Sequence, residues 1–146
     1  MSELRSPDLV LALLSVVRML RAIRSIELEK IGLNVGQDEV LLALKLGEAM
    51  PVTELARHIS VQPSTASKMI DRLVRGGFVE RHLHAGDARR SMIRLSQRGM
   101  EMQSAVGAIW IRIEEELASV GADDKTLSRL RAFEHGVSKM LKAVRR

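Results

Sequence analysis

Hydrophobic residues near the start of the chain recur at helical spacing and predict one long helix. Ser6 as a cap, Pro7 as the first helical residue and Asp8 in the first turn predict its start, and Gly32 its end. The apolar positions form a wide stripe made of Leu9, Leu13, Val16, Val17, Leu20, Ile23 and Ile26. A stripe of this width is more than one small chain can cover, so we expect a second chain to pack against it.

Three shorter helices are predicted next. The first spans residues 36–46 and is broken by Gly47, Met50 and Pro51. The second, TELARHIS, is expected to be capped by Thr53, and the turn Ser60-Val61-Gln62 follows it.

The third of these helices, PSTASKMIDRLVRG, is expected to begin at Pro63 and to end at Gly76-Gly77. One stripe of it is apolar and consists of Ala66, Met69, Ile70, Leu73 and Val74. The other side is polar and consists of Ser64, Thr65, Ser67, Lys68, Asp71 and Arg72. We therefore expect this helix to pack on one side and to leave a polar face in solvent.

After this helix the hydrophobic period changes to that of strands. Residues 78–84 and 91–95 are predicted to form a hairpin, and the polar turn 85–90 gives it a basic tip. Ser96 is expected to cap a helix that runs to about Val120 and ends at Gly121. A last helix is predicted from Asp123 or Asp124 to the C-terminus. Without a repeat or a linker, residues 1–146 are expected to form a single domain.

Composition supports this helical pattern. The only aromatic residues are Phe78, Trp110 and Phe133, so the core has to be aliphatic, which favours packed helices over sheets. The absence of cysteine excludes disulfides, thiolate chemistry and Cys-ligated zinc. The apolar run 9–17 is too short to span a membrane and lacks the basic start of a signal peptide, so a cytoplasmic protein without membrane contact is expected.

Positive charge is concentrated in one segment. The net charge of the chain is +5, and residues 57–98 hold nine Lys or Arg against three acids, so that the rest of the chain is slightly negative. A basic segment in a neutral frame is typical of proteins that bind polyanions, although a merely solvated face is the alternative.

Two short helices joined by a brief turn and followed by a hairpin form a winged helix-turn-helix. The second helix of such a pair fits the major groove of DNA, and small hydroxyl side chains in its first turn allow close approach. The hairpin tip can place Arg89 or Arg90 in the neighbouring minor groove, where negative potential favours a guanidinium. The predicted fold is therefore mainly α with a small β-hairpin wing.

These residues resemble the MarR family of transcriptional regulators. The resemblance runs from Glu54 to Gly99 and covers about a third of the chain. Its marks are Glu54-Leu55-Ala56, Asp71-Arg72-Leu73, Gly77-Phe78-Val79-Glu80-Arg81, Asp87-x-Arg89 and Leu95-Ser96-x-x-Gly99.

The resemblance implies a bacterial homodimer that presents two winged helix-turn-helix lobes (residues 35–96) to a pseudo-palindromic operator. Residues 1–34 and 97–146 would supply the dimerisation helices. It further implies that the Asp87–Arg89 pair organises the wing, that Arg89 reaches the minor groove, and that Arg90 stands where the family often has a small residue. A small-molecule effector would act where the dimer helices meet the lobe.

Residues predicted to contact DNA combine these arguments and are Thr53, Gln62, Pro63, Ser64, Thr65, Ser67, Lys68, Arg72, Arg75, Arg81, Asp87, Arg89 and Arg90. Arg72 has two interpretations, contact with a phosphate or pairing with an acid that braces the lobe. Arg75 and Arg81 are expected to meet phosphates rather than bases.

Two further groups carry chemistry of their own. His82 and His84 lie on one face of a strand at a spacing that zinc can use, but no carboxylate completes the set, and a polar strand face is the favoured interpretation. Arg18, Arg21 and Arg24 are expected to pair with acids such as Glu27, and the alternative is contact with an anionic effector.

The sequence thus predicts a sequence-specific, ligand-responsive repressor of the MarR type that binds double-stranded DNA as a homodimer. A DNA-architectural protein without sequence preference is the second hypothesis. An enzyme is the weakest, because no GxSxG, P-loop, GxGxxG or HExxH motif occurs; no catalytic residue, metal or cofactor is predicted.

Overall fold

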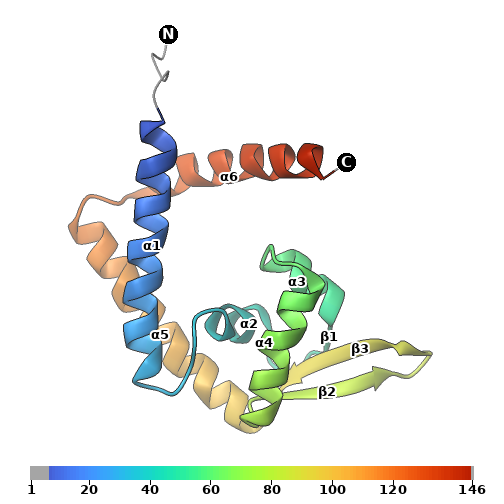
Figure 1. Ribbon diagram of the computed structural model, residues 1–146. Helices are drawn as coiled ribbons and strands as arrows, with labels where there is room; N and C mark the ends of the chain where they lie inside the picture. Colours follow the sequence, from blue (N-terminus) through green and yellow to red (C-terminus); the bar gives the residue numbers. More distant parts are fainter. Residues whose placement is uncertain (1–6, 146) are drawn as a thin grey trace. The chain divides into compact units, whose positions relative to one another are not determined.

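The computed structural model describes the backbone of residues 7–145, without the side chains of His84, Asp87, Ala88 and Arg89. The chain divides into two compact units, residues 1–109 and residues 110–146. Its elements in order are α1 (Asp8–Glu29), α2 (Gln37–Ala43), β1 (Met50–Pro51), α3 (Val52–His58), α4 (Pro63–Arg75), β2 (Val79–His84), β3 (Asp87–Leu95), α5 (Gln97–Ser119) and α6 (Asp124–Val144) (Figure 1). Among the described residues, none of the helices combines the length and the apolar character that a membrane span needs.

The long first helix was predicted correctly, with a small difference at its start. α1 begins at Asp8, so Pro7 occupies the N-cap position rather than the first helical position, and Ser6 lies outside the described residues. Leu28 is its only buried residue, near the end at which Gly32 takes a positive φ of 76°. Most of the apolar side chains of α1 are exposed: Leu9, Val10, Leu11, Leu14, Val16, Val17, Met19, Ile23 and Ile26.

Arg24 on α1 pairs with acids, as predicted. It binds Asp38 and Glu39 on α2, both at 2.7 Å, and Glu27 contacts Lys30 at 2.6 Å. The two carboxylates of α2 accept hydrogen bonds from the Arg24 guanidinium, which can donate to more than one acceptor at once.

Of the two helices α3 and α4, only α4 begins where its capping residues predict. α4 begins at Pro63 as predicted, and Gln62 precedes it in an extended conformation. Thr53 was expected to cap α3, but the helix already begins at Val52 and Pro51 stands at the N-cap. The prediction for Thr53 was wrong because Pro51 is drawn into a strand and the chain turns into the helix directly after it.

That strand, β1, makes the sheet three-stranded, in the order β1-β3-β2, where only a hairpin was predicted. Met50 pairs with Ile93, and Pro51 with Met92, both antiparallel. A two-residue segment has no alternation to read in a sequence, and proline is tolerated there because β1 is an edge strand.

The hairpin itself is longer than predicted. β3 begins at Asp87, so the turn is reduced to Ala85 and Gly86 instead of residues 85–90. The register runs regularly from Val79 opposite Leu95 to Leu83 opposite Ser91 and then shifts, so that His84 pairs with Asp87. Residues 88–90 of β3 therefore form a bulge beside the turn. Arg89 and Arg90 lie on this bulge and not in the tip.

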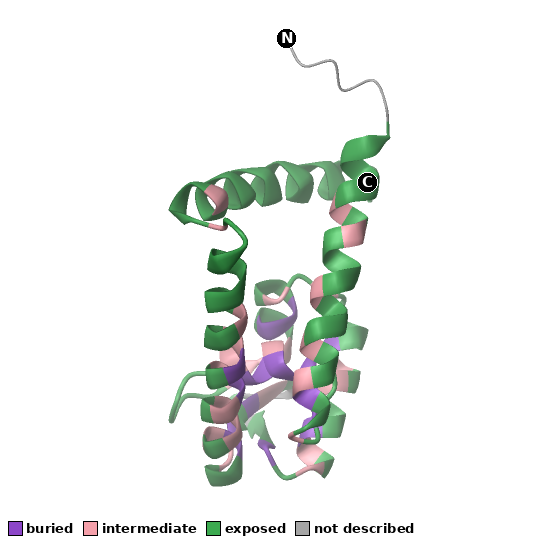
Figure 2. Ribbon diagram, turned by 90° about the vertical axis from the view of Figure 1, so that its left-hand side faces the viewer, coloured by how far each residue is buried: buried purple, intermediate pink, exposed green. Residues whose placement is uncertain are grey.

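The core of the first unit is aliphatic, as predicted from the scarcity of aromatic residues. It is formed where the end of α1, α2, α3, α4, the sheet and the first half of α5 meet (Figure 2). Its largest fully buried side chains are Leu28, Leu41, Leu44, Leu55, Ile70, Leu73, Ile93, Val40, Val79 and Val106. Each such side chain contributes about 1.5–3 kcal/mol through removal from water, so this core holds the helices and the sheet together.

The wing joins α5 through a tight turn. The backbone N–H of Ser96 donates to the carbonyl of Phe78 at 3.0 Å, and the Ser96 hydroxyl donates to the carbonyl of Gly77 at 2.6 Å. The same hydroxyl oxygen accepts the N–H of Gly99 at 3.0 Å, which confirms Ser96 as the predicted N-cap of α5. Gly99 leaves no room for a side chain, since a Cβ there would lie 1.8 Å from the Phe78 carbonyl oxygen.

The second unit contains the remainder of α5 and all of α6. Gly121 takes a φ of 104° in the turn between them, and α6 begins at Asp124, one of the two predicted starts, with Asp123 as its N-cap. The Asp123 carboxylate accepts the N–H of Thr126 at 2.8 Å, which lowers the pKa of that carboxyl. No residue of α6 is buried, and its exposed apolar side chains are Leu127, Leu130, Phe133, Val137, Met140, Leu141 and Val144.

The contact between α5 and the Phe78 carbonyl can be tested by Gly99→Ala. Because the new methyl group would overlap the Phe78 carbonyl, we expect the free energy of unfolding in urea to fall by at least about 1–3 kcal/mol. Gly107→Ala is the matched control on the same helix, since nothing lies within 4 Å of a Cβ there. Equal stability of the two variants would show that the tight contact does not exist.

Candidate nucleic-acid interface

α4 buries one side and exposes the side predicted to read DNA. Ala66, Ile70 and Leu73 are buried in the core. On the opposite side, Gln62, Pro63, Ser64, Thr65, Lys68 and Arg72 are exposed, and Ser67 is partly exposed. The structure thus gathers seven predicted contact residues on α4 and its N-cap, with the small hydroxyl side chains in the first half of the helix.

Electrostatics at the start of α4 favour an anion. The first turn contains no acidic residue, and no side chain caps the backbone N–H groups there. Helix N-termini carry partial positive charge, and their unpaired N–H groups can donate to phosphate. Lys68 adds a full charge one turn later, so the exposed start of this helix suits a phosphate-rich ligand.

The turn before α4 is held in a fixed shape. Ser60 adopts a positive φ of 57°, which is uncommon for a residue other than glycine. The N–H of Val61 donates to the carbonyl of Ala56 at 2.9 Å and closes the turn on α3. This geometry fixes the angle between α3 and α4, and Thr53 remains exposed on α3, away from the buried Leu55 and Ala56.

Arg81 fastens the wing to α4. Its guanidinium contacts the Asp71 carboxylate at 2.5 Å and donates to the Ser91 hydroxyl at 3.2 Å. One arginine therefore links α4, β2 and β3. A bracing pair with an acid was one of the two interpretations of Arg72, but the bracing pair found here joins its neighbour Asp71 to Arg81.

A second ion pair lies across the wing strands. The Glu80 carboxylate accepts the Arg94 guanidinium at 3.0 Å and lies 3.3 Å from His82. Hydrogen bonding to Arg94, and then to His82, lowers the pKa of Glu80. The imidazole of His82 thus takes part in a strand-face pair, while the side chain of His84 lies outside the described residues. Across the described part of the chain, no three His, Asp or Glu side chains are grouped as metal ligands.

The remaining positive charges are exposed around α4 and the wing. Within the described residues, Lys68, Arg72 and Arg75 form no ion pair, and Arg90 is exposed beside the bulge. Arg98 lies over the ring of Phe78, 4.8 Å from its centre. The predicted pair Asp87 and Arg89 lies outside the residues whose side chains are described. Because Asp71 and Glu80 are both engaged by arginines, this surface keeps a positive excess.

Residues 33–91 match the model of the MarR family, which confirms the resemblance over that range. No curated protein sequence matches the chain. Among solved structures, the transcriptional regulator SlyA is 23% identical, with a TM-score of 0.75 over 94% of each chain.

Two structures that contain DNA are also similar. Reduced AbfR bound to DNA is 23% identical, with a TM-score of 0.76 over 92% of each chain. A mutant of MarR from E. coli complexed with operator DNA is 20% identical, with a TM-score of 0.73 over 93% of this chain and 99% of that one. These likenesses show the fold, and they confirm the predicted class, mainly α with a small winged sheet.

Proposed function

We propose that this chain is a transcriptional regulator of the MarR type that binds double-stranded DNA as a homodimer. The observation that carries the proposal is the exposed, acid-free start of α4, flanked by cations without an ion pair in the described residues and braced against a wing. The match of residues 33–91 to the MarR family and the fold shared with DNA-bound regulators support it.

In the proposed complex, the first half of α4 enters the major groove. Ser64, Thr65 and Ser67 are short enough to bring the helix close to base edges, and Lys68 meets a phosphate. Gln62 and Pro63 begin the helix at the sugar-phosphate backbone. Thr53, Arg72 and Arg75 extend the contact to neighbouring phosphates.

The wing would contact the adjacent minor groove. Arg89 and Arg90 occupy the bulge of β3, which breaks the regular pairing of the two strands. Asp87 would orient the bulge. Arg81 has a bracing role through Asp71, so we assign it to positioning the wing and only secondarily to phosphate contact.

A homodimer explains the exposed apolar surface. Val17 on α1 is 61% exposed and Leu130 on α6 is 54% exposed, and both belong to longer apolar faces. Monomeric proteins rarely leave such faces in water. A second copy of the chain can cover them, because in a two-fold dimer both copies contribute the same face to the contact. Two-fold symmetry would then place two α4 helices on half-sites about 10 bp apart.

Regulation is the finer part of the proposal. We infer that the dimer acts in the cytoplasm as a repressor, without a cofactor or catalysis, and that a small molecule bound between the dimerisation helices and the lobe relieves repression. An architectural DNA-binding protein is the second candidate, favoured only by the sequence-independent character of phosphate contacts.

Sequence specificity separates these candidates. After selection of bound duplexes from a random library, we expect the selected duplex to bind at least ~10³-fold more tightly than random duplex at physiological salt. Lys68→Gln should weaken binding to every duplex and reduce the salt slope by about 1, because it removes a phosphate contact. Lys125→Gln, in the first turn of α6, is the matched control and should bind like the parent. Equal affinity of the parent for selected and random duplexes would contradict the regulator.

The dimer can be tested by its mass in solution. We expect sedimentation equilibrium to give twice the 16.2 kDa of one chain. Leu130→Glu should shift the equilibrium toward monomers, because it places a carboxylate in the apolar face of α6. Ser128→Glu introduces the same group on the opposite side of that helix and should leave the dimer intact. A parent protein that sediments as a monomer at micromolar concentration would overturn this part of the proposal.

A further inference from the structure

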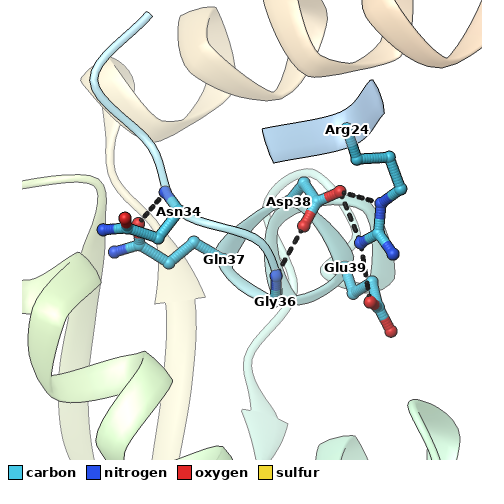
Figure 3. A network of polar contacts seen from close by, with 6 residues as sticks. All are labelled: Arg24, Asn34, Gly36, Gln37, Asp38 and Glu39. Carbon is cyan, nitrogen blue, oxygen red and sulfur yellow. Dashed lines mark hydrogen bonds and ion pairs between the residues drawn. The ribbon is translucent and has the colours of Figure 1, made fainter. Parts of the chain in front are cut away.

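A buried carboxylate connects the first helix to the lobe. Asp38, in the first turn of α2, has no exposed surface. Its Oδ2 accepts two hydrogen bonds from Arg24, from Nε at 3.0 Å and from Nη2 at 2.7 Å (Figure 3). Its Oδ1 accepts the backbone N–H of Gly36 at 2.8 Å. One side chain thus fixes both a residue of α1 and the backbone that leads into α2.

Arg24 is suited to hold this geometry. Its side chain is 17% exposed and also contacts Glu39 at 2.7 Å. Burial alone would lower the pKa of Arg24, but the hydrogen bonds and charges of Glu39 and Asp38 raise it, so the guanidinium stays charged. A guanidinium fork between two carboxylates is directional, whereas an apolar contact between helices can slide.

The network reaches α4 through Gly36. This residue has a φ of 103°, which the bond from its N–H to Asp38 holds in place. A Cβ on Gly36 would lie 2.7 Å from the Cε atom of Met69, so the backbone of Gly36 packs directly on α4. Gln37 secures the same loop, since its Oε1 atom accepts the N–H of Asn34 at 2.7 Å. The contacts run continuously from α1 through the start of α2 to α4.

We propose that the Arg24–Asp38 pair is a positioning device that sets the angle at which α4 is held relative to α1. The inference rests on the proposed homodimer, in which α1 lies at the contact between the two copies. If α1 is fixed in the dimer, its angle to α4 determines the separation of the two α4 helices. Arg24 and Asp38 therefore select which spacing of DNA half-sites the dimer accepts, although neither touches DNA.

A buried ion pair is better suited to this role than to adding stability. Removing two charges from water costs about as much as their attraction returns, so such a pair contributes little to the free energy of unfolding. The pair instead favours one arrangement of the helices, because only that arrangement gives each of its hydrogen-bonding groups a partner. These properties suit a pair that fixes the angle between α1 and α4 and adds little to the free energy of unfolding.

Arg24→Lys tests the inference, because lysine keeps the charge but its single ammonium cannot reproduce the fork. Arg21→Lys is the matched control, an exposed arginine of the same helix. Binding is measured on duplexes whose half-site separation is varied one base pair at a time. We expect a sharp optimum for the parent and for Arg21→Lys. For Arg24→Lys we expect about tenfold weaker binding at that optimum and a flattened profile.

A second readout needs no DNA. The chain has no cysteine, so Ser64→Cys provides a single attachment point for a spin label on the exposed start of α4. The distance distribution between the labels of the two copies should be at least twice as wide in Arg24→Lys as in the labelled parent. Glu39→Gln, which removes one partner of Arg24 and leaves Asp38, should broaden it less and serves as the test variant if Arg24→Lys does not fold.

The two proposals fail in different ways. A folded, dimeric Arg24→Lys protein with the distance distribution and spacing profile of the parent overturns the positioning role and leaves the regulator standing. The same outcome for Glu39→Gln overturns it when Arg24→Lys does not fold. A labelled parent that shows no distance between copies overturns the dimer and, with it, this inference.

Discussion

The carbonyl group of Phe78 is the point at which the functional elements are joined. It accepts the N–H of Ser96, and Gly99 brings the first turn of α5 against it without a side chain between them. The Ser96 hydroxyl closes the same junction by binding Gly77 and Gly99. The segment that follows α4, the base of the wing and the start of α5 are therefore fixed together, so α4 and the wing keep one geometry.

Around this junction, ion pairs fix the angles between neighbouring elements, and the aliphatic core holds these elements together. Arg81 holds the wing to α4 through Asp71, and Arg24 holds α1 to α2 through Asp38. The core beneath is made of leucine, isoleucine and valine, which pack without directional preference. Direction comes from the polar contacts, and in the described residues Lys68, Arg72 and Arg75 lie outside these ion pairs.

Local patterns made much of this fold predictable. The apolar spacing of α1 and α4, the helix start at Pro63 and the caps at Ser96 and Asp123 all depend on residues within a few positions of one another. The exposed face of α4 followed from the same periodicity. Because the family resemblance rested on motifs that fix turns, the winged class was predictable as well.

Contacts between distant residues were not predictable. β1 is too short to show alternation, and its pairing with Ile93 is decided by the fold of the lobe. Asp38 lies 14 residues from Arg24 in the sequence, and its pairing with Arg24 is decided by the spatial arrangement of α1 and α2. The bulge that moves Arg89 and Arg90 onto β3 depends on strand register, which a polar turn sequence does not encode.

We propose that one surface, formed by the start of α4 and the bulge of the wing, contacts DNA. Backbone amide chemical shifts of the isotope-labelled protein can be recorded with and without the selected duplex to locate the contact. We expect the largest changes at residues 62–68 and 87–90 and small changes throughout α6. Changes that are largest in α6, or that are spread evenly over the chain, would contradict it.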